Sequence, residues 1–226
     1  MSIENVKGMI WDLDGTLIDS AKILPVVLRE LALVRGLVMP TDEEIRRNFH
    51  GTMDQTLEAL FDISSKEERD ELAAAFYDRQ EAHYETPSEH LYEDAIDLAR
   101  RAAERDIIQL VLTNRGHAGR RSASPHAIVG NTVLANYIHE IRAGDEVVAQ
   151  KPDVAAVSDW VEKHTLTGED ILVVGDQVPD GQLAINLGAR AILIKRGGDI
   201  PNMERLSENW QNHIEIVDNL SSVELA

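Results

Sequence analysis

Four aspartates stand in two short runs where side chains of this type could do chemistry together. Asp12 and Asp14 belong to the run WDLDGTL, and Asp176 and Asp180 belong to the run VGDQVPDG. Clustered carboxylates repel one another and raise one another's pKa unless a cation lies among them. Oxygen ligands without cysteine or histidine partners favour a hard cation, and Mg²⁺ is the ion we expect. The four aspartates are therefore the candidate metal ligands.

Three further residues could bind an anion beside this metal. Thr113 and Asn114 follow an apolar run, so a hydroxyl and a backbone amide could hold an oxyanion there. Lys151 precedes a proline and could place an ammonium group nearby. Each motif alone is also typical of an ordinary turn, and either Asp176 or Asp180 could simply cap a helix. Together, a carboxylate nucleophile, a metal and a fixed lysine are what phosphoryl transfer needs.

Short apolar runs that read as buried strands must position these motifs. They alternate with helical patterns, which is typical of crossover units and a parallel sheet. We expect an α/β fold with a Rossmann-like parallel sheet and helices on both faces. The carboxyl ends of parallel strands share one edge of a sheet, so the motifs should converge there. The expected strands are 6–11, 107–113, 171–175, 191–194 and 214–217, and the expected helices are 94–105, 152–163 and 179–187.

One long stretch interrupts this alternation. Residues 18–86 contain no convincing strand and are predicted to form successive helices at 20–36, 42–49, 53–61 and 66–84. We expect an all-helical domain at 18–86, inserted after the first strand of a discontinuous core at 1–17 and 87–226. Such an insertion would lie over the strand ends, where open parallel sheets bind ligands.

Composition excludes several classes of partner. The chain of 226 residues has 22 basic and 40 acidic side chains and a net charge of −18, which disfavours nucleic acids and anionic membranes. It lacks cysteine, and none of its apolar runs is long enough to span a membrane. We therefore expect a cytoplasmic location. The acidic surface fits an ordinary cytosolic protein or a high-salt habitat. The expected partner is a small phosphorylated molecule, and the protein could be a monomer or a homodimer.

The motifs, in this order, resemble those of the haloacid dehalogenase superfamily of phosphatases, in its phosphoglycolate phosphatase and β-phosphoglucomutase branch. The resemblance rests on the run DLDGT at Asp12, then Thr113, Lys151-Pro152 and Gly175-Asp176 with Asp180. The helical insertion resembles the family's α-helical cap of the first type.

The resemblance also implies roles. Asp12 would be the nucleophile that forms an aspartyl-phosphate, and Asp14 the general acid and then the general base. The Asp14 carbonyl with Asp12 and Asp176 would hold Mg²⁺, and Asp180 would support the metal. Thr113 and Lys151 would bind the transferring phosphate.

The presence of Asp14 favours a phosphatase over the family's dehalogenases and phosphonate hydrolases, which lack an acid there. A sugar-phosphate mutase on the same scaffold and a non-catalytic binding protein remain the alternatives. Substrate choice is expected in the loop that holds His50, Gly51 and Thr52. In β-phosphoglucomutase-like caps an arginine closely follows this glycine. Its absence from residues 52–57 disfavours the mutase.

Overall fold

The computed structural model describes residues 2–48, 53–116 and 120–226. The chain divides into two compact units. The core unit comprises Met1–Asp19, Pro87–Gly119 and Ser124–Ala226, and the helical unit comprises Ser20–Thr86 with Arg120–Ala123. Each unit has its own buried apolar interior.

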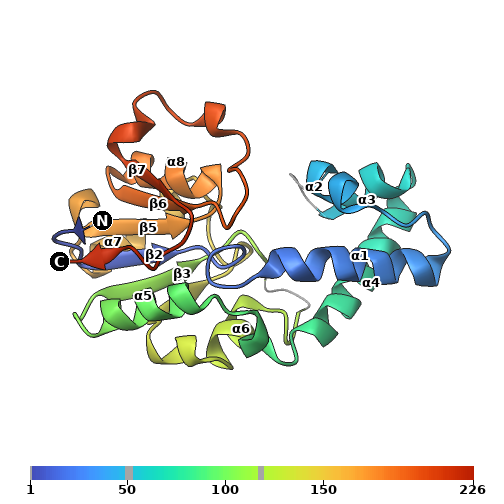
Figure 1. The fold of residues 1–226 in the computed structure, drawn as a ribbon, viewed down its shortest axis with the longest axis horizontal. Coiled ribbons are helices and arrows are strands. Elements are labelled where there is room, and N and C mark those ends of the chain that lie inside the picture. The colour runs from blue at the N-terminus through green and yellow to red at the C-terminus, as the bar shows by residue number, and fades with distance from the viewer. Residues whose placement is uncertain (1, 49–52, 117–119) are drawn as a thin grey trace. The chain divides into compact units, whose positions relative to one another are not determined.

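A six-stranded parallel sheet forms the centre of the core unit (Figure 1). Its strand order is β4-β3-β2-β5-β6-β7, so the first long strand of the chain lies in the middle. Ile10 of the central strand stands beside Leu110 on one side and Val173 on the other. The strands are β2 (Gly8–Trp11), β3 (Ile108–Leu112), β4 (Glu140–Arg142), β5 (Ile171–Gly175), β6 (Arg190–Ile194) and β7 (Ile214–Val217). A separate two-stranded sheet pairs β1 (Ser2–Ile3) with β8 (Glu224–Leu225).

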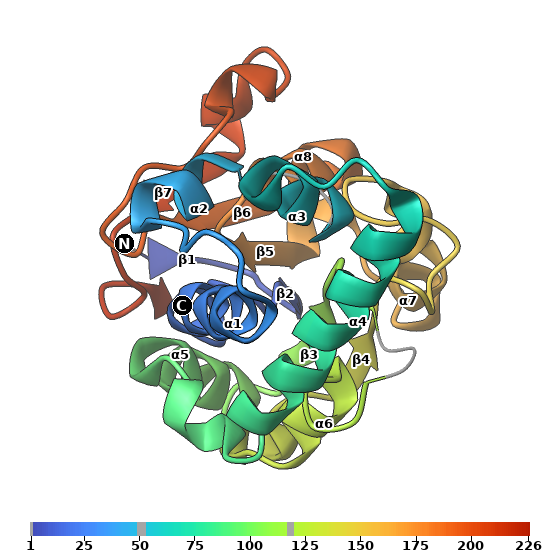
Figure 2. The ribbon, with the colours of Figure 1, turned by 90° about the vertical axis from the view of Figure 1, so that its right-hand side faces the viewer.

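Helices cover both faces of the sheet, which confirms the expected fold class. Helices α5 (Glu93–Ala103) and α6 (Pro125–Gly130) lie on one face, and α7 (Ser158–Lys163) and α8 (Val178–Leu187) lie on the other (Figure 2). Side chains of a strand alternate between the two faces.

The central strand shows this alternation. Ile10 packs in one cluster with Trp160 and Leu183. Trp11, its neighbour, donates its indole N–H to Gln109 at 2.9 Å. The amide of Gln109 in turn donates to the carbonyl of Ala99 in α5. Both faces of the sheet are thus buried, which accounts for its unbroken apolar strands.

Sequence reasoning missed one strand and misjudged one helix. The polar sequence Glu-Ile-Arg forms the edge strand β4, for which no strand was predicted. The expected helix at 152–163 is broken: Asp153 accepts a hydrogen bond from the Ala155 N–H and starts a short 3₁₀ turn at Val154–Ala156. Val157 then takes a non-helical φ of −137°, and the α-helix begins only at Ser158.

The helical unit contains α1 (Ser20–Arg35), α2 (Asp42–Asn48), α3 (Met53–Phe61) and α4 (Lys66–His83). Leu28, Leu31, Leu57 and Phe76 are buried between them. The hydroxyl of Ser65 accepts a hydrogen bond from the Glu68 N–H and caps the longest helix.

The segment Arg120–Ala123 is attached to α4 by one carboxylate. Glu81 accepts hydrogen bonds from the backbone N–H groups of Arg121, Ser122 and Ala123, at 3.0, 2.6 and 3.2 Å. The Arg120 guanidinium lies over the Tyr77 ring, 4.4 Å from its centre. These contacts explain why four residues from the second half of the chain belong to the helical unit.

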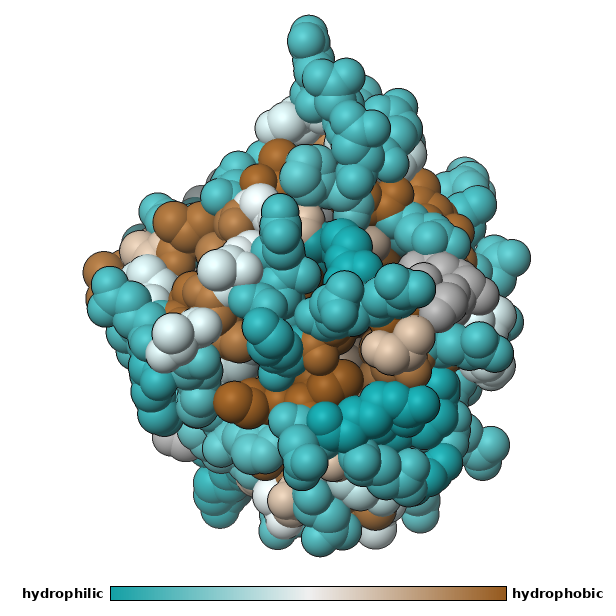
Figure 3. Space-filling model, turned by 90° about the vertical axis from the view of Figure 1, so that its left-hand side faces the viewer, coloured by the Kyte–Doolittle hydropathy of each residue, from teal (hydrophilic) through white to brown (hydrophobic). Residues whose placement is uncertain are grey.

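The surface is mainly hydrophilic on the face shown in Figure 3, with smaller apolar areas between. Within the described residues, no helix combines the length and the apolar character that a membrane span requires.

Candidate active site

The loop after β2 places the first pair of aspartates. Asp12 continues the strand, since its N–H donates to the Val174 carbonyl of β5. The chain then turns sharply at Gly15, which has a φ of +73°. A Cβ on Gly15 would lie 2.2 Å from a carboxylate oxygen of Asp176, so both the conformation and the space require glycine. Hydrogen bonds from Leu17 and Ile18 back to the Leu13 carbonyl close the turn.

Three carboxylates meet beside this turn. Each of Asp12, Asp176 and Asp180 offers an oxygen atom, and these atoms lie within 4.8 Å of one another. Asp12 and Asp180 are 7% and 2% exposed. The Oδ1 atom of Asp176 is buried and has no hydrogen-bond partner. A buried carboxylate oxygen without a hydrogen-bond donor is costly, and three carboxylate oxygens are the kind of ligands that a hard cation prefers, so the cluster fits such an ion.

Lys151 is the cation that the chain itself supplies. Its Nζ lies 2.6 Å from Asp12 and 2.6 Å from Asp180, and its side chain is 3% exposed. Burial opposes a charge on this amine, but the attraction of Asp12 and Asp180 outweighs it and raises the pKa of Lys151. Lys151 therefore stays protonated and bridges the two carboxylates.

One lysine does not neutralise the cluster. Burial raises the pKa of Asp12 to about 7; Lys151 opposes this shift, and the charges of Asp180 and Asp14 add to it. Burial also raises the pKa of Asp176, with further repulsion from Asp12 and Asp180. A divalent cation in the cluster would stabilise the ionised form of Asp12, the form that can act as a nucleophile.

The other expected site residues, Thr113, Asn114 and Asp180, make hydrogen bonds with Lys151 or with neighbouring loops. Asn114 faces the backbone of Lys151, from which its Oδ1 accepts a hydrogen bond at 3.1 Å. Thr113 is 2% exposed, and its hydroxyl accepts a hydrogen bond from the Arg115 N–H. Asp180 has two roles, since it contacts Lys151 and also accepts from the Gln177 N–H at the start of α8. The helix-capping interpretation of Asp180 was therefore correct without excluding a place in the site.

Asp14 lies apart from the three-carboxylate cluster. Both of its oxygens accept hydrogen bonds from Arg115, with the Nε–Oδ2 distance at 2.8 Å. Its expected contribution to the metal was a backbone carbonyl, so this side-chain arrangement does not conflict with that role. Sequence reasoning did not identify Arg115 as a site residue. Its partner Asp14 lies 101 positions away in the chain, so no local pattern links the two.

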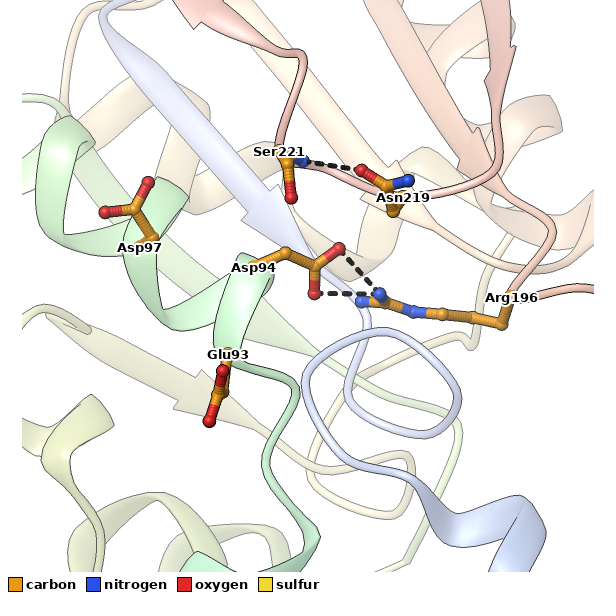
Figure 4. Close-up of a pocket in the computed structure, with 6 residues that line it drawn as sticks. All are labelled: Glu93, Asp94, Asp97, Arg196, Asn219 and Ser221. Atoms are coloured by element: carbon orange, nitrogen blue, oxygen red, sulfur yellow. Dashed lines mark hydrogen bonds and ion pairs between the residues drawn. The ribbon is translucent and has the colours of Figure 1, made fainter.

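Arg196, which sequence reasoning also missed, contacts the loop after β2 and pairs with Asp94, as Figure 4 shows for the pair. Arg196 follows β6, and its Nη1 lies 2.8 and 2.7 Å from the two oxygens of Asp94. Its Nη2 donates to the carbonyl of Thr16 at 2.9 Å, and its guanidinium stacks on the Tyr92 ring at 3.7 Å. Asp94 also accepts a hydrogen bond from the Leu220 N–H. This network joins the start of α5, the end of β6 and the C-terminal segment to the loop that carries Asp14.

The structure brings Asp12, Asp176, Asp180 and Lys151 together, with Asn114 against the Lys151 backbone and Asp14 on Arg115. The residues expected to select the substrate, His50, Gly51 and Thr52, lie outside the described residues.

Comparison with known families gives this fold and site a class. The model of the haloacid dehalogenase-like hydrolase family matches residues 9–194, and the chain belongs to that family. The matched region runs from the central strand β2 to the end of β6, so it includes every residue of the carboxylate cluster.

Individual relatives agree with this assignment. The chain is 27% identical over 192 residues to a phosphoglycolate phosphatase of Rhodobacter capsulatus, a match covering 84% of each chain. It is 26% identical over 207 residues to a phosphoglycolate phosphatase of Vibrio parahaemolyticus, covering 87% of each. Among solved structures, a predicted phosphoglycolate phosphatase from Haemophilus somnus has a TM-score of 0.77 at 18% identity, over 96% of each chain. A β-phosphoglucomutase-like structure from Thermotoga maritima has a TM-score of 0.73 at 16% identity, over 96% and 95% of the two chains, and shares the fold.

Proposed function

We propose that the protein is a Mg²⁺-dependent phosphatase that hydrolyses a small phosphomonoester through an aspartyl-phosphate on Asp12. The observation that carries the proposal is the position of Asp12. Its carboxylate lies 2.6 Å from the buried Lys151 ammonium and within the cluster that contains the unpartnered Oδ1 of Asp176. The names of the relatives support the same reaction class.

The metal would be held by Asp12 and Asp176, with the Asp14 carbonyl as a third ligand and Asp180 in support. Bound Mg²⁺ would offset the repulsion between the carboxylates and an incoming phosphate dianion. Lys151 and the hydroxyl of Thr113 would bind the phosphate oxygens. Because Lys151 is fixed by two carboxylates and by Asn114, it needs no rearrangement to meet the substrate.

The reaction proceeds in two steps. An oxygen of Asp12 attacks phosphorus, the bond from phosphorus to the ester oxygen breaks, and Asp14 gives its proton to the departing alkoxide. Asp14 then takes a proton from water, the hydroxide oxygen attacks the same phosphorus, and the phosphorus–Asp12 bond breaks. Inorganic phosphate leaves and Asp12 returns to its carboxylate form, so atoms and protons balance over the cycle.

Release of inorganic phosphate from nitrophenyl phosphate tests the proposal. We expect turnover with Mg²⁺ and none in EDTA. In the isosteric variant Asp12→Asn, kcat should fall by at least about 10³-fold, because removing a catalytic nucleophile costs at least this much. In Asp14→Asn, mass spectrometry should detect a phosphoryl group on the peptide that contains Asp12. Wild-type turnover in Asp12→Asn would refute the nucleophile. Phosphate retained in an organic isomer, with no inorganic phosphate released from sugar phosphates, would indicate the mutase instead.

A further inference from the structure

The helical unit carries most of the large apolar side chains that the described part of the chain exposes. Seven such side chains are exposed there, and five of them lie between residues 26 and 39. We call these five the apolar patch: Val26, Leu33, Val34, Val38 and Met39, with exposed fractions of 43, 73, 63, 84 and 47%. Scattered exposed apolar residues are ordinary, but a cluster of them is typical of a surface that another molecule covers.

Packing inside the helical unit does not use these side chains. Helix α1 contacts α4 and buries one face, which includes Val27, Leu28 and Leu31. Leu33 follows Leu31 by two residues, so it lies roughly 200° further around the helix and away from that face. The unit therefore has a complete interior of its own, and the patch is apolar for a different reason.

The chain after α1 is tied back to the helix. Arg29, in the middle of α1, donates its Nε to the Pro40 carbonyl at 3.3 Å and pairs with the carboxylate of Asp42. The residues between, which include Val38 and Met39, form a turn that is closed on α1. A turn that is already fixed loses little conformational freedom when another surface covers it, and this favours binding.

The distribution of charge indicates a second copy of the chain as the partner. The whole chain has a net charge of −18, so most of its surface repels another copy. Residues 20–45 carry three basic and four acidic side chains, so this segment is nearly neutral. The repulsion between two copies is therefore weakest where the apolar patch lies.

Two charged residues of opposite sign make the patch complementary to itself. Arg35 is the last residue of α1 and Glu43 lies in the first turn of α2, and both are exposed. Neither side chain forms an ion pair with another residue of the described chain. In an isologous contact, the Arg35 of one copy can meet the Glu43 of the other, and the two-fold axis then forms this pair twice.

We propose that the apolar patch is the interface of a two-fold symmetric homodimer. Leu33, Val34 and Val38 of both copies form its apolar centre, and two ion pairs between Arg35 and Glu43 form its rim. The patch is small beside a standard interface of about 20–30 residues a side, so we expect a dimer that dissociates on dilution. None of these residues belongs to the proposed active site, so this inference does not depend on the proposed function.

Sedimentation velocity of the full chain over a series of concentrations tests the interface. The wild-type protein should shift from the mass of one chain to the mass of two as its concentration rises. Leu33→Glu and Val38→Glu each bring two like charges into the apolar centre. Each should raise the dissociation constant of the dimer by at least about 10-fold. Both positions are largely exposed, so neither substitution should disturb the folding of the single chain.

A matched control and a charge exchange make the test specific. Val148→Glu makes the same chemical change at a position of the core unit that is 93% exposed, and it should dimerise like the wild-type protein. Arg35→Glu and Glu43→Arg should each weaken the dimer by about 5- to 10-fold, because each places like charges across the axis. The double variant restores opposite charges there and should regain the wild-type dissociation constant.

Three results would overturn the proposal. The first is a wild-type protein that stays a single chain at its highest soluble concentration. The second is a dimer whose dissociation constant is the same in Leu33→Glu, Val38→Glu and Val148→Glu, since its interface would then lie elsewhere. The third is a wild-type protein that does not self-associate but floats with phosphatidylcholine vesicles, with flotation lost in Leu33→Glu. That result would assign the patch to a lipid surface instead.

Discussion

The isosteric variant Asp12→Asn should be more stable than the wild-type protein when the metal is removed, and the difference should grow with pH. Asp12 has a pKa of about 7 in the folded protein, against 3.8 in the unfolded chain. The folded state therefore holds a proton that the unfolded state has already released. An acid with a raised pKa weakens the fold as pH rises from 3.8 through 7, and the effect is complete above 7. Asparagine in this position does not titrate, so the variant escapes this loss.

The size of the effect follows from the two pKa values. Because one pKa unit corresponds to about 1.4 kcal/mol, the linkage relation gives a destabilisation of about 1.5 kcal/mol at pH 5 and about 4 kcal/mol at pH 8. The free energy of unfolding of Asp12→Asn relative to wild type should thus rise by about 2.5 kcal/mol between these two conditions. Saturating Mg²⁺ should remove most of the rise, because a cation stabilises the ionised Asp12 of the wild-type protein.

Urea denaturation in EDTA, followed by tryptophan fluorescence, measures this difference. The three tryptophans, Trp11, Trp160 and Trp210, all belong to the core unit, so the signal reports the unit that contains Asp12. Glu162→Gln is a matched control, since it removes an exposed carboxylate from α7 of the same unit. Its stability relative to wild type should not change between the two pH values. A stability difference between Asp12→Asn and wild type that stayed constant, or shrank, as pH rises would mean that the pKa of Asp12 is not raised in the folded protein.

Three other substitutions probe the supports of the site. Gln109→Met should lower the free energy of unfolding by about 2–4 kcal/mol in urea, because the Trp11 N–H and two carbonyls lose their buried partner; a loss below about 0.5 kcal/mol would contradict this reading. Arg196→Met should cost about 3 kcal/mol and raise the Mg²⁺ concentration for half-maximal activity, because Asp94 loses its cation and the Thr16 carbonyl its donor. An unchanged Mg²⁺ requirement in that variant would limit Arg196 to a structural role. Asp14→Asn should reduce single-turnover transfer by about 10²–10⁴-fold for ethyl phosphate and far less for nitrophenyl phosphate, whose leaving group needs little proton donation; equal losses would exclude Asp14 as the general acid.

The sheet could be predicted where its strands are both apolar and long enough to show a pattern. Strands β2 and β5 consist almost wholly of buried residues, and both were identified from their composition. The three residues of β4 are half-buried and two of them are charged, so only the neighbouring strand makes them a strand. The late start of the expected helix at 152–163 depends on one hydrogen bond, from the Ala155 N–H to the Asp153 side chain, which helix propensity does not predict.

The carboxylate cluster could be predicted for a different reason. Each aspartate pair is local in sequence and follows a recognisable strand, and a parallel sheet gathers strand ends at one edge. The two arginines had no such signal. Arg115 meets Asp14 across 101 positions, and Arg196 meets Asp94 across 102. Neither arginine has a local pattern around it, so these pairs become visible only when the loops are packed together.

The central place of β2 has a consequence for how the chain is made. Its two partners, β3 at Ile108–Leu112 and β5 at Ile171–Gly175, are made about 100 and 160 residues later, so one edge of the first long strand stays unpaired for about half of synthesis and the other edge for about three quarters of it. The helical unit is almost contiguous at Ser20–Thr86 and can form during that wait. An apolar strand with two open edges is a template for pairing with other chains. Newly made protein should therefore depend on chaperones until β5 emerges, and truncation before residue 171 should yield aggregates rather than a smaller folded core.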